Sequence, residues 1–232
     1  MKYLNIYKAT FLSRPNRFIA ECLLDEKVVI THVKNTGRCR ELLIPGATVY
    51  LDEPKGRERK TKYDLIAVEK ALQNGKTLLI NMDSGAPNDA VAEFLKNGDL
   101  FPNATKIRRE VTKGKSRFDF CIEEGEKTTY LEVKGVTLEN NGIASFPDAP
   151  TERGVKHIEE LIDLKEQGFG AAILFVIQMK GINQFTPNDI THKAFGDALR
   201  RAQKFGVNIY AYDSIVTPDS LTIDRPIKVK LQ

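Results

Sequence analysis

The stretch that decides the fold is Arg117-Phe118-Asp119-Phe120, followed after a turn by Tyr130-Leu131-Glu132-Val133-Lys134-Gly135. Each half alternates apolar and charged residues, which is the period of a strand with one face in a core. The alternation places Phe118, Phe120, Leu131 and Val133 on one face, and Asp119, Glu132 and Lys134 on the other. The segment between them, residues 123–127, is polar and contains Gly125. Such a segment is typical of a turn, so the stretch predicts a β-hairpin.

The predicted hairpin brings two carboxylates together. If its turn centres on Gly125-Glu126, Asp119 lies directly across from Glu132. Side chains opposed in this way have Cβ atoms roughly 4.5–5.5 Å apart, and like charges there are destabilising. We therefore predict a metal ion between Asp119 and Glu132, with Mg²⁺ (or Mn²⁺) as the ion that carboxylates suit. Lys134 lies two residues beyond Glu132 on the same face, where its ammonium can reach the same substrate.

The composition is ordinary for a soluble globular protein. The 232 residues are 41% hydrophobic and 28% charged, enough for one large domain or two small ones. The longest apolar run, residues 171–177, is too short to span a bilayer, and the N-terminus has no signal-peptide pattern. Three scattered cysteines favour reduced thiols over a disulfide frame or a zinc site. We expect a cytoplasmic protein with no membrane segment.

The N-terminal part is basic and rich in short strands. Residues 1–83 contain 15 Lys/Arg and 10 Asp/Glu, whereas the whole chain has a formal net charge of only +4. Such a surplus favours a polyanionic partner. Turn-forming segments separate five expected strands, at residues 16–24, 28–34, 47–52, 63–72 and 76–82. Five short strands without a long helix predict a small OB-like β-barrel, and such barrels often bind oligonucleotides.

Two loops of this part carry arginines. Residues 55–62 include Arg57 and Arg59 among five basic residues in eight, which suits phosphate contact, although a charge run of this kind by itself favours a solvated loop. Residues 35–40 include Arg38 and Arg40, which could grip phosphate through bidentate forks or simply form a tight turn.

The pattern changes near residues 83–87, where we place a boundary between domains 1–83 and 84–232. Beyond it we expect a helix that Asn88 or Asp89 caps and Gly98 ends, then a strand at residues 106–111 and the hairpin. A helix at residues 151–167, a buried strand at 171–179, a helix at 194–205 and a strand at 207–212 follow. This order predicts a mixed-sheet α/β domain.

The helix at residues 151–167 carries a second group of polar residues. Arg153, Lys156, His157 and Glu160 share one face at helical spacing. Three potential donors near a helix N-terminus suit phosphate binding, although a solvated surface explains them equally well.

Two other motifs are excluded. Gly114-Lys115-Ser116 resembles the end of a P-loop, but Arg109 stands where the first glycine belongs and a strand follows. Residues 194–212 do not form a helix-turn-helix motif, because the segment after Gly206 has the pattern of a strand.

Several motifs together resemble the sugar fermentation stimulation protein (SfsA) family. They are Asn16-Arg17-Phe18, Asn35-Thr36-Gly37, Leu131-Glu132-Val133-Lys134 and, most specifically, residues 146–154 (FPDAPTERG) with Lys156-His157. The resemblance implies an OB-like N-terminal domain joined to a PD-(D/E)XK nuclease-like, or restriction-endonuclease-like, α/β domain that binds DNA. It assigns the first acidic position to Asp119 and the E-x-K to Glu132 and Lys134. Phe118 stands where that superfamily has proline.

Two hypotheses from different classes follow. In the first, the chain is a Mg²⁺-dependent nuclease with Asp119, Glu132 and Lys134 as catalytic residues. Arg17, Arg38, Arg57, Arg59, Arg153, Lys156 and His157 then contact the nucleic acid, for which DNA is favoured. In the second, it is a non-catalytic DNA-binding regulator of sugar (maltose) metabolism genes. The sequence leaves strandedness, sequence preference and oligomeric state open.

Overall fold

The computed structural model describes residues 1–35, 37–54, 60–72 and 75–232. Arg57 and Arg59 of the basic loop therefore lie outside the described residues, as does Thr36 of the second loop. The N-terminal part consists of β1 (Ile6–Asn16), β2 (Ile19–Leu24), β3 (Lys27–Val33), β4 (Thr48–Asp52), β5 (Tyr63–Ala71) and β6 (Thr77–Asn81).

These strands form a closed OB-like barrel, as predicted. Strands β1–β5 follow the order β3-β2-β1-β4-β5, and a parallel pairing of β3 with β5 closes the ring. Strand β6 continues the sheet beyond β5. Apolar side chains fill the barrel, and Phe11, Val49, Leu51 and Leu65 are almost completely buried.

The set of five predicted strands was incomplete, because β1 is a sixth. Its burial pattern does not alternate regularly, and its pairing with β2 shifts register twice before it ends near Pro15. A strand with such irregularities has no clear two-residue period in its sequence.

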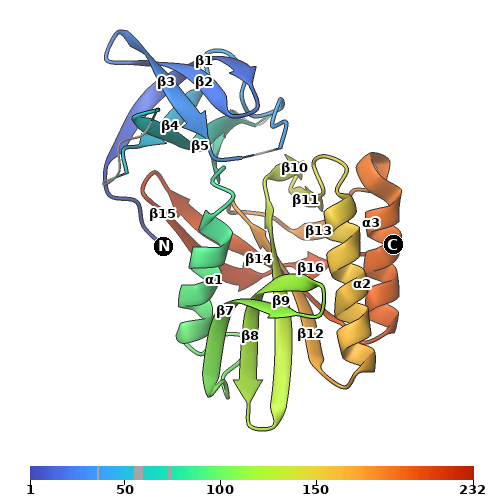
Figure 1. The fold of residues 1–232 in the computed structure, drawn as a ribbon. Coiled ribbons are helices and arrows are strands. Elements are labelled where there is room, and N and C mark those ends of the chain that lie inside the picture. The colour runs from blue at the N-terminus through green and yellow to red at the C-terminus, as the bar shows by residue number, and fades with distance from the viewer. Residues whose placement is uncertain (36, 55–59, 73–74) are drawn as a thin grey trace.

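The C-terminal part is a mixed α/β layer (Figure 1). Its elements are α1 (Ala86–Lys96), β7 (Lys106–Lys113), β8 (Ser116–Glu124), β9 (Lys127–Val136), α2 (Glu152–Glu166), β12 (Gly170–Ile177), α3 (Asp189–Lys204), β14 (Asn208–Thr217) and β15 (Ser220–Pro226). The main sheet has the order β15-β14-β12-β9-β8-β7. Strands β9, β12 and β14 are parallel, and every residue of β12 is buried. The predicted mixed sheet is therefore confirmed.

A second, small sheet was not predicted. It consists of β10 (Leu138–Asn140), β11 (Ile143–Phe146), β13 (Gln184–Pro187) and β16 (Lys228–Val229). Strands of two to four residues are too short to show a period.

Helices cover both faces of the main sheet. On one face α1 packs Val91 and Leu95 into a cluster with Leu174 of β12. On the other face α2 and α3 pack Leu161 and Phe195 into a separate cluster. Figure 1 shows α1 apart from the α2–α3 pair, with the hairpin strands β8 and β9 between them. The hairpin therefore runs between two apolar cores.

The helix ends differ from prediction at two places. The N-cap of α1 is Gly85, which has no capping side chain, so the predicted cap by Asn88 or Asp89 is wrong. Helix α3 begins at Asp189, before the predicted start, because Asn188 accepts a hydrogen bond from the Thr191 N–H. The C-terminal glycine of α1 was predicted well: Gly98 has φ +86°, which a glycine adopts at little cost.

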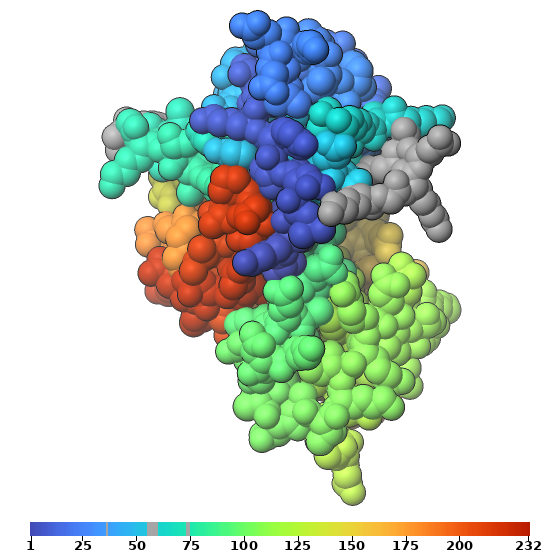
Figure 2. Space-filling view, turned by 90° about the vertical axis from the view of Figure 1, so that its left-hand side faces the viewer, coloured from blue at the N-terminus to red at the C-terminus, as the bar shows by residue number. Residues whose placement is uncertain are grey.

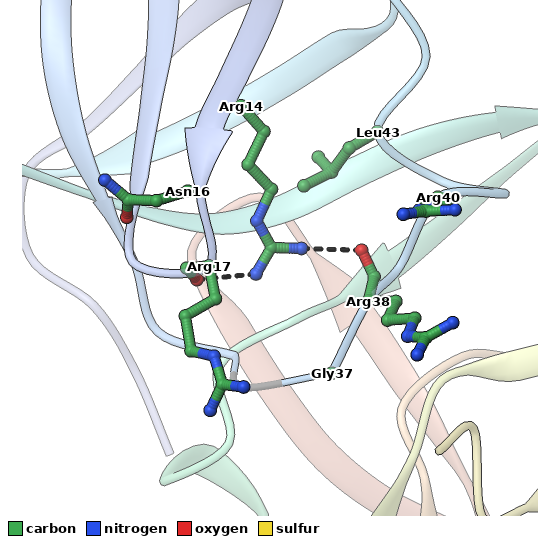
Figure 3. Close-up of a pocket in the computed structure, with 7 residues that line it drawn as sticks. All are labelled: Arg14, Asn16, Arg17, Gly37, Arg38, Arg40 and Leu43. Carbon is green, nitrogen blue, oxygen red and sulfur yellow. Dashed lines mark hydrogen bonds between the residues drawn. The ribbon is translucent and has the colours of Figure 1, made fainter.

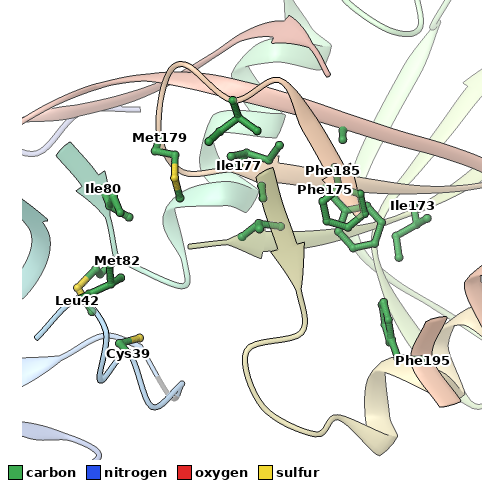
Figure 4. Packing of buried hydrophobic residues seen from close by; sticks show 14 of the residues in the cluster. Cys39, Leu42, Ile80, Met82, Ile173, Phe175, Ile177, Met179, Phe185 and Phe195 are labelled. Carbon is green, nitrogen blue, oxygen red and sulfur yellow. The ribbon is translucent and has the colours of Figure 1, made fainter. Parts of the chain in front are cut away.

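The barrel and the layer are packed against each other. Cys39, Leu42 and Met82 of the barrel side belong to the same buried cluster as Ile177 and Met179 (Figure 4). The N-terminal segment also crosses from one part to the other. Met1 donates to Glu93 of α1 and to the Leu221 carbonyl of β15, and Figure 2 shows this segment between α1 and β15. Among the described residues, no helix has the length and apolar character needed to cross a membrane.

Candidate active site

The register of the β8–β9 hairpin matches the prediction. Phe120 pairs with Leu131 and Cys121 pairs with Tyr130, which makes Asp119 and Glu132 the next residues on the two strands. The ladder does not continue to them. Instead, the Asp119 carboxylate accepts a hydrogen bond of 2.8 Å from the Val133 N–H. The side chain of Asp119 has therefore taken the place of a main-chain partner.

This irregularity also changes the direction of Phe118. The alternation predicted that Phe118 and Phe120 share a face, and this prediction is wrong. Phe118 belongs to the cluster beneath α2, with its ring centroid 5.6 Å from that of Tyr130. Phe120 belongs to the cluster beneath α1. Strand β8 thus changes its buried face at Asp119, the residue next to the last β8–β9 pair, Phe120 and Leu131.

Two neighbours hold the Asp119 carboxyl group in place. The Nδ2 of Asn88, on α1, donates to its Oδ1 at 2.8 Å, while Val133 N–H holds the other oxygen. Burial and the nearby Glu132 raise the pKa of Asp119, and these hydrogen bonds only partly oppose the rise. Ionisation of Asp119 is therefore unfavourable unless a cation binds beside its carboxylate.

Glu132 has the most constrained side chain of the site. It is 3% exposed, and its Oε1 accepts from Lys134 Nζ at 2.5 Å and from His157 Nδ1. Burial alone would raise the pKa of Glu132, but the bonds from His157 and Lys134 outweigh it and lower the pKa. Glu132 is thus held ionised at neutral pH.

The second oxygen of this carboxylate, Glu132 Oε2, is buried and has no hydrogen-bond partner. A buried charged oxygen without a partner is rare, because its desolvation is not compensated. A hard divalent cation accepts one or two carboxylates and completes its coordination with water and phosphate oxygens. In the described part of the chain, no group of three or more His, Cys, Asp or Glu residues is arranged so that it could hold a metal ion by itself. The unpartnered Oε2 of Glu132 and the raised pKa of the neighbouring Asp119 are two features that a bound divalent cation would satisfy, and the Mg²⁺ site expected from the hairpin stays a prediction.

Lys134 and Gly135 shape the open side of this arrangement. The Lys134 side chain is 16% exposed, so its ammonium borders solvent while it contacts Glu132. Gly135 is closely surrounded: a Cβ there would lie 2.5 Å from Gln178 Oε1 and 2.9 Å from Pro87 Cγ. Because Pro87 precedes Asn88 at the start of α1, this close contact fixes the helix that positions Asp119.

The predicted polar face of α2 is divided in the structure. Arg153 and Lys156 are exposed, as expected, and Lys156 lies 3.7 Å from Glu160. His157 instead turns inward and is 6% exposed, with Nδ1 on Glu132 and Nε2 accepting from Arg153 Nε at 3.3 Å. The structure therefore differs from the expected exposed His157: both ring nitrogens are engaged within the protein.

The remaining predicted contacts lie on the barrel. Arg17 and Arg38 line a hollow of about 340 Å³, together with Arg14 and Arg40 (Figure 3). Sequence reasoning missed two residues: Asn88 as a partner of Asp119, and Arg14 as an organiser of this hollow. Asn88 follows Pro87 at a helix start and so resembled a cap. For Arg14 the sequence holds no signal, because its partners are main-chain carbonyls distant in the chain.

Comparison with known proteins agrees with this architecture. Residues 12–80 match the model of the SfsA N-terminal OB domain, and residues 85–220 match that of the sugar fermentation stimulation protein RE domain. The solved structure titled "The structure of Pyrococcus Furiosus SfsA in complex with Ca2+" superposes with a TM-score of 0.88. It is 26% identical, and the match covers 99% of this chain and 98% of that one.

Similar sequences carry the same family name. A sugar fermentation stimulation protein homolog of Desulfitobacterium hafniense (strain Y51) is 55% identical over 100% of this chain and 99% of its own. A homolog of Ruminiclostridium cellulolyticum is 50% identical over 100% of both chains, and one of Clostridium botulinum (strain Kyoto / Type A2) is 52% identical over 98% of both. With both domain models matched in order and relatives aligned over the full length, this chain belongs to the sugar fermentation stimulation protein family.

Proposed function

We propose that this protein is a Mg²⁺- or Mn²⁺-dependent nuclease that binds DNA and hydrolyses its phosphodiester bonds. The observation that carries the proposal is the buried, unpartnered Oε2 of Glu132 beside Asp119, whose pKa is raised by burial and by Glu132. A carboxylate pair that served the fold alone would have both members satisfied within the protein.

Further support comes from the related structure and from the barrel. The Pyrococcus furiosus protein is described in complex with Ca²⁺, a hard cation that takes oxygen ligands as Mg²⁺ does. The OB-like domain belongs to a fold that often binds oligonucleotides, and the N-terminal part has a surplus of positive charge.

Asp119 and Glu132 would hold the metal. A bound metal would polarise a phosphoryl oxygen of the substrate and lower the pKa of a bound water. His157 keeps Glu132 turned toward the site, and Asn88 does the same for Asp119. Lys134 orients the attacking water or balances the negative charge that develops on the phosphorus oxygens. Arg153 and Lys156, exposed at the start of α2, bind neighbouring phosphates.

The test is incubation of the pure protein with single- and double-stranded DNA and RNA, in Mg²⁺, in Mn²⁺ and in EDTA. We expect metal-dependent cleavage of DNA that Asp119→Asn eliminates while the protein stays folded. A surface variant such as Lys27→Gln, at the far end of the barrel, serves as the matched control. Binding without cleavage in either metal would instead favour the non-catalytic regulator of sugar metabolism genes.

A further inference from the structure

We propose that the arginine-lined hollow of the barrel binds the backbone of single-stranded DNA and leads it to the hairpin site. Delivery of the strand to the hairpin site rests on the proposed function, whereas binding of the strand in the hollow does not. The hollow is lined by Arg14, Asn16, Arg17, Gly37, Arg38, Arg40 and Leu43. Four of these seven residues are arginines and none is acidic, so the hollow suits an anion.

Arg14 is the organiser of the hollow and not a binding group. Its guanidinium donates to the main-chain carbonyls of Arg38 at 2.7 Å, Arg17 at 2.6 Å and Asn35 at 2.9 Å. It thereby ties the β1–β2 turn to the loop that follows β3, two segments that are separate in the sequence. Asn16 shapes the same turn, because its Oδ1 accepts from the Phe18 and Ile19 N–H groups. The two arginine-bearing segments are therefore held in a fixed relation before any ligand arrives.

The other three arginines are available for a ligand. The side chains of Arg17, Arg38 and Arg40 are exposed (Figure 3), and none of them forms an ion pair with another described residue. An arginine side chain without an acidic partner can take a phosphate through bidentate hydrogen bonds. A backbone with a phosphate at every nucleotide can meet several such groups that border one hollow.

Single-stranded DNA is indicated by the aromatic residue beside the arginines. Phe18 is 49% exposed, and the Arg17 guanidinium lies 5.8 Å from the centroid of its ring. A base can stack on such a ring only when it is not stacked within a duplex. A volume of about 340 Å³ also lies in the range of small-ligand pockets and is enough for a nucleotide.

A second hollow continues from the first toward the hairpin. Its volume is about 410 Å³, and it shares Arg17 and Gly37 with the first. Its lining also includes Gly135, the residue after Lys134, and Thr151, the N-cap of α2. The two adjoining hollows therefore extend from Arg17 to Gly135, the residue after Lys134, and to the start of α2.

The junction between the two hollows is closely packed. A Cβ on Gly37 would lie 2.0 Å from Asp148 Oδ2, so the arginine loop rests directly on the segment that precedes α2. Asp148 also lines the second hollow, and burial raises the pKa of its carboxyl group. The loop at Gly37 and the segment that precedes α2 thus form one closely packed surface between the barrel and the α/β layer.

The test measures binding in EDTA, so that it does not depend on cleavage. The probe is a fluorescent single-stranded DNA of about 12 nucleotides, within the site sizes of OB folds, and a duplex of equal length is the comparison. We expect the single strand to bind more tightly. Arg17→Gln/Arg40→Gln should weaken binding about tenfold or more, because each hydrogen bond that it removes is charge-assisted. The salt slope of log K should fall by about 0.7 for each phosphate that the variant no longer binds.

Two further variants separate charge from stacking and control for both. Phe18→Leu should weaken binding about fivefold or more while leaving the salt slope unchanged. Lys8→Gln/Lys27→Gln removes the same charge at the opposite end of the barrel, roughly 20 Å or more along the strands, and should change affinity little. Melting curves establish that each variant is folded.

The proposal is overturned if duplex binds as tightly as single strand, if RNA of the same sequence binds more tightly than DNA, or if Arg17→Gln/Arg40→Gln changes affinity no more than the control. Failure of the nuclease proposal has a different outcome: the strand binds as described, but Mg²⁺ produces no cleavage.

Discussion

Replacement of His157 tests how the site holds Glu132 ionised. The His157 side chain is 7% exposed, and its Nδ1 donates to Glu132 Oε1. His157→Ala removes a hydrogen bond to a charged group, worth about 2 kcal/mol, and leaves a cavity beside Phe118 that costs at least about 1 kcal/mol more. For a chain of this size, about 3 kcal/mol lowers the melting temperature by roughly 6–12 °C.

His157→Gln provides the matched control, because a glutamine amide can still donate to Glu132. We expect it to recover the part of the loss that comes from the hydrogen bond, and so to melt between wild type and His157→Ala. The assay is thermal unfolding followed by circular dichroism at pH 7 in EDTA. If His157→Ala melts within about 2 °C of wild type, or if the two variants melt alike, His157 does not hold Glu132 and the reasoning fails.

Three other variants or conditions test separate parts of the site. Gly135→Ala forces a Cβ to within 2.5 Å of Gln178 Oε1, so we expect a loss of about 1–3 kcal/mol in thermal unfolding, and an unchanged melting temperature would contradict the close packing. Because the pKa of Asp119 is raised, protons compete with the metal at higher pH than for an ordinary aspartate. The rise in melting temperature that Mg²⁺ causes should therefore become smaller as the pH falls toward that raised pKa. Thermal unfolding measured from pH 7 downward would show a constant rise if Asp119 is not a ligand. Arg153→Ala/Lys156→Ala should weaken DNA binding. The loss of Lys156 should change the stability by about 0.5 kcal/mol, and the loss of Arg153 by somewhat more, because Arg153 also donates to His157. If the double variant binds DNA normally, this face of α2 does not contact the nucleic acid.

The hairpin and both folds could be predicted because their signals are local. Strands β8 and β9 alternate in sequence, and a glycine turn fixed their register, so the proximity of Asp119 and Glu132 followed from counting. Helix α2 begins and ends within one residue of the predicted range 151–167, because its helical spacing is visible in the sequence. These features depend on residues a few positions apart.

What could not be predicted depends on contacts distant in sequence. The Val133 N–H donates to the Asp119 carboxylate and not to a main-chain carbonyl, and Phe118 then faces the other side of the sheet. No pattern in the sequence of the strand indicates this change. His157 has helical spacing with Arg153 and Lys156, so only the position of Glu132 beneath the helix decides that it turns inward. Strand β1 was missed because its bulges obscure the two-residue period.

The measurement that tests the central claim most directly is the melting temperature of wild type, Asp119→Asn and Lys134→Ala, each with and without Mg²⁺. Burial and Glu132 raise the pKa of Asp119, so Asp119→Asn removes an unfavourable charge. The new amide nitrogen cannot accept the hydrogen bond from Asn88, but Asn88 can reverse its own amide and accept instead, so the metal-free protein should be equally stable or slightly more stable. We predict that Mg²⁺ raises the melting temperature of wild type by mass action, that Asp119→Asn largely abolishes this shift together with cleavage, and that Lys134→Ala keeps the shift but loses turnover. If Asp119→Asn melts well below wild type and Mg²⁺ shifts neither protein, the carboxylate pair is a structural element of the hairpin and the metal-dependent nuclease account is contradicted.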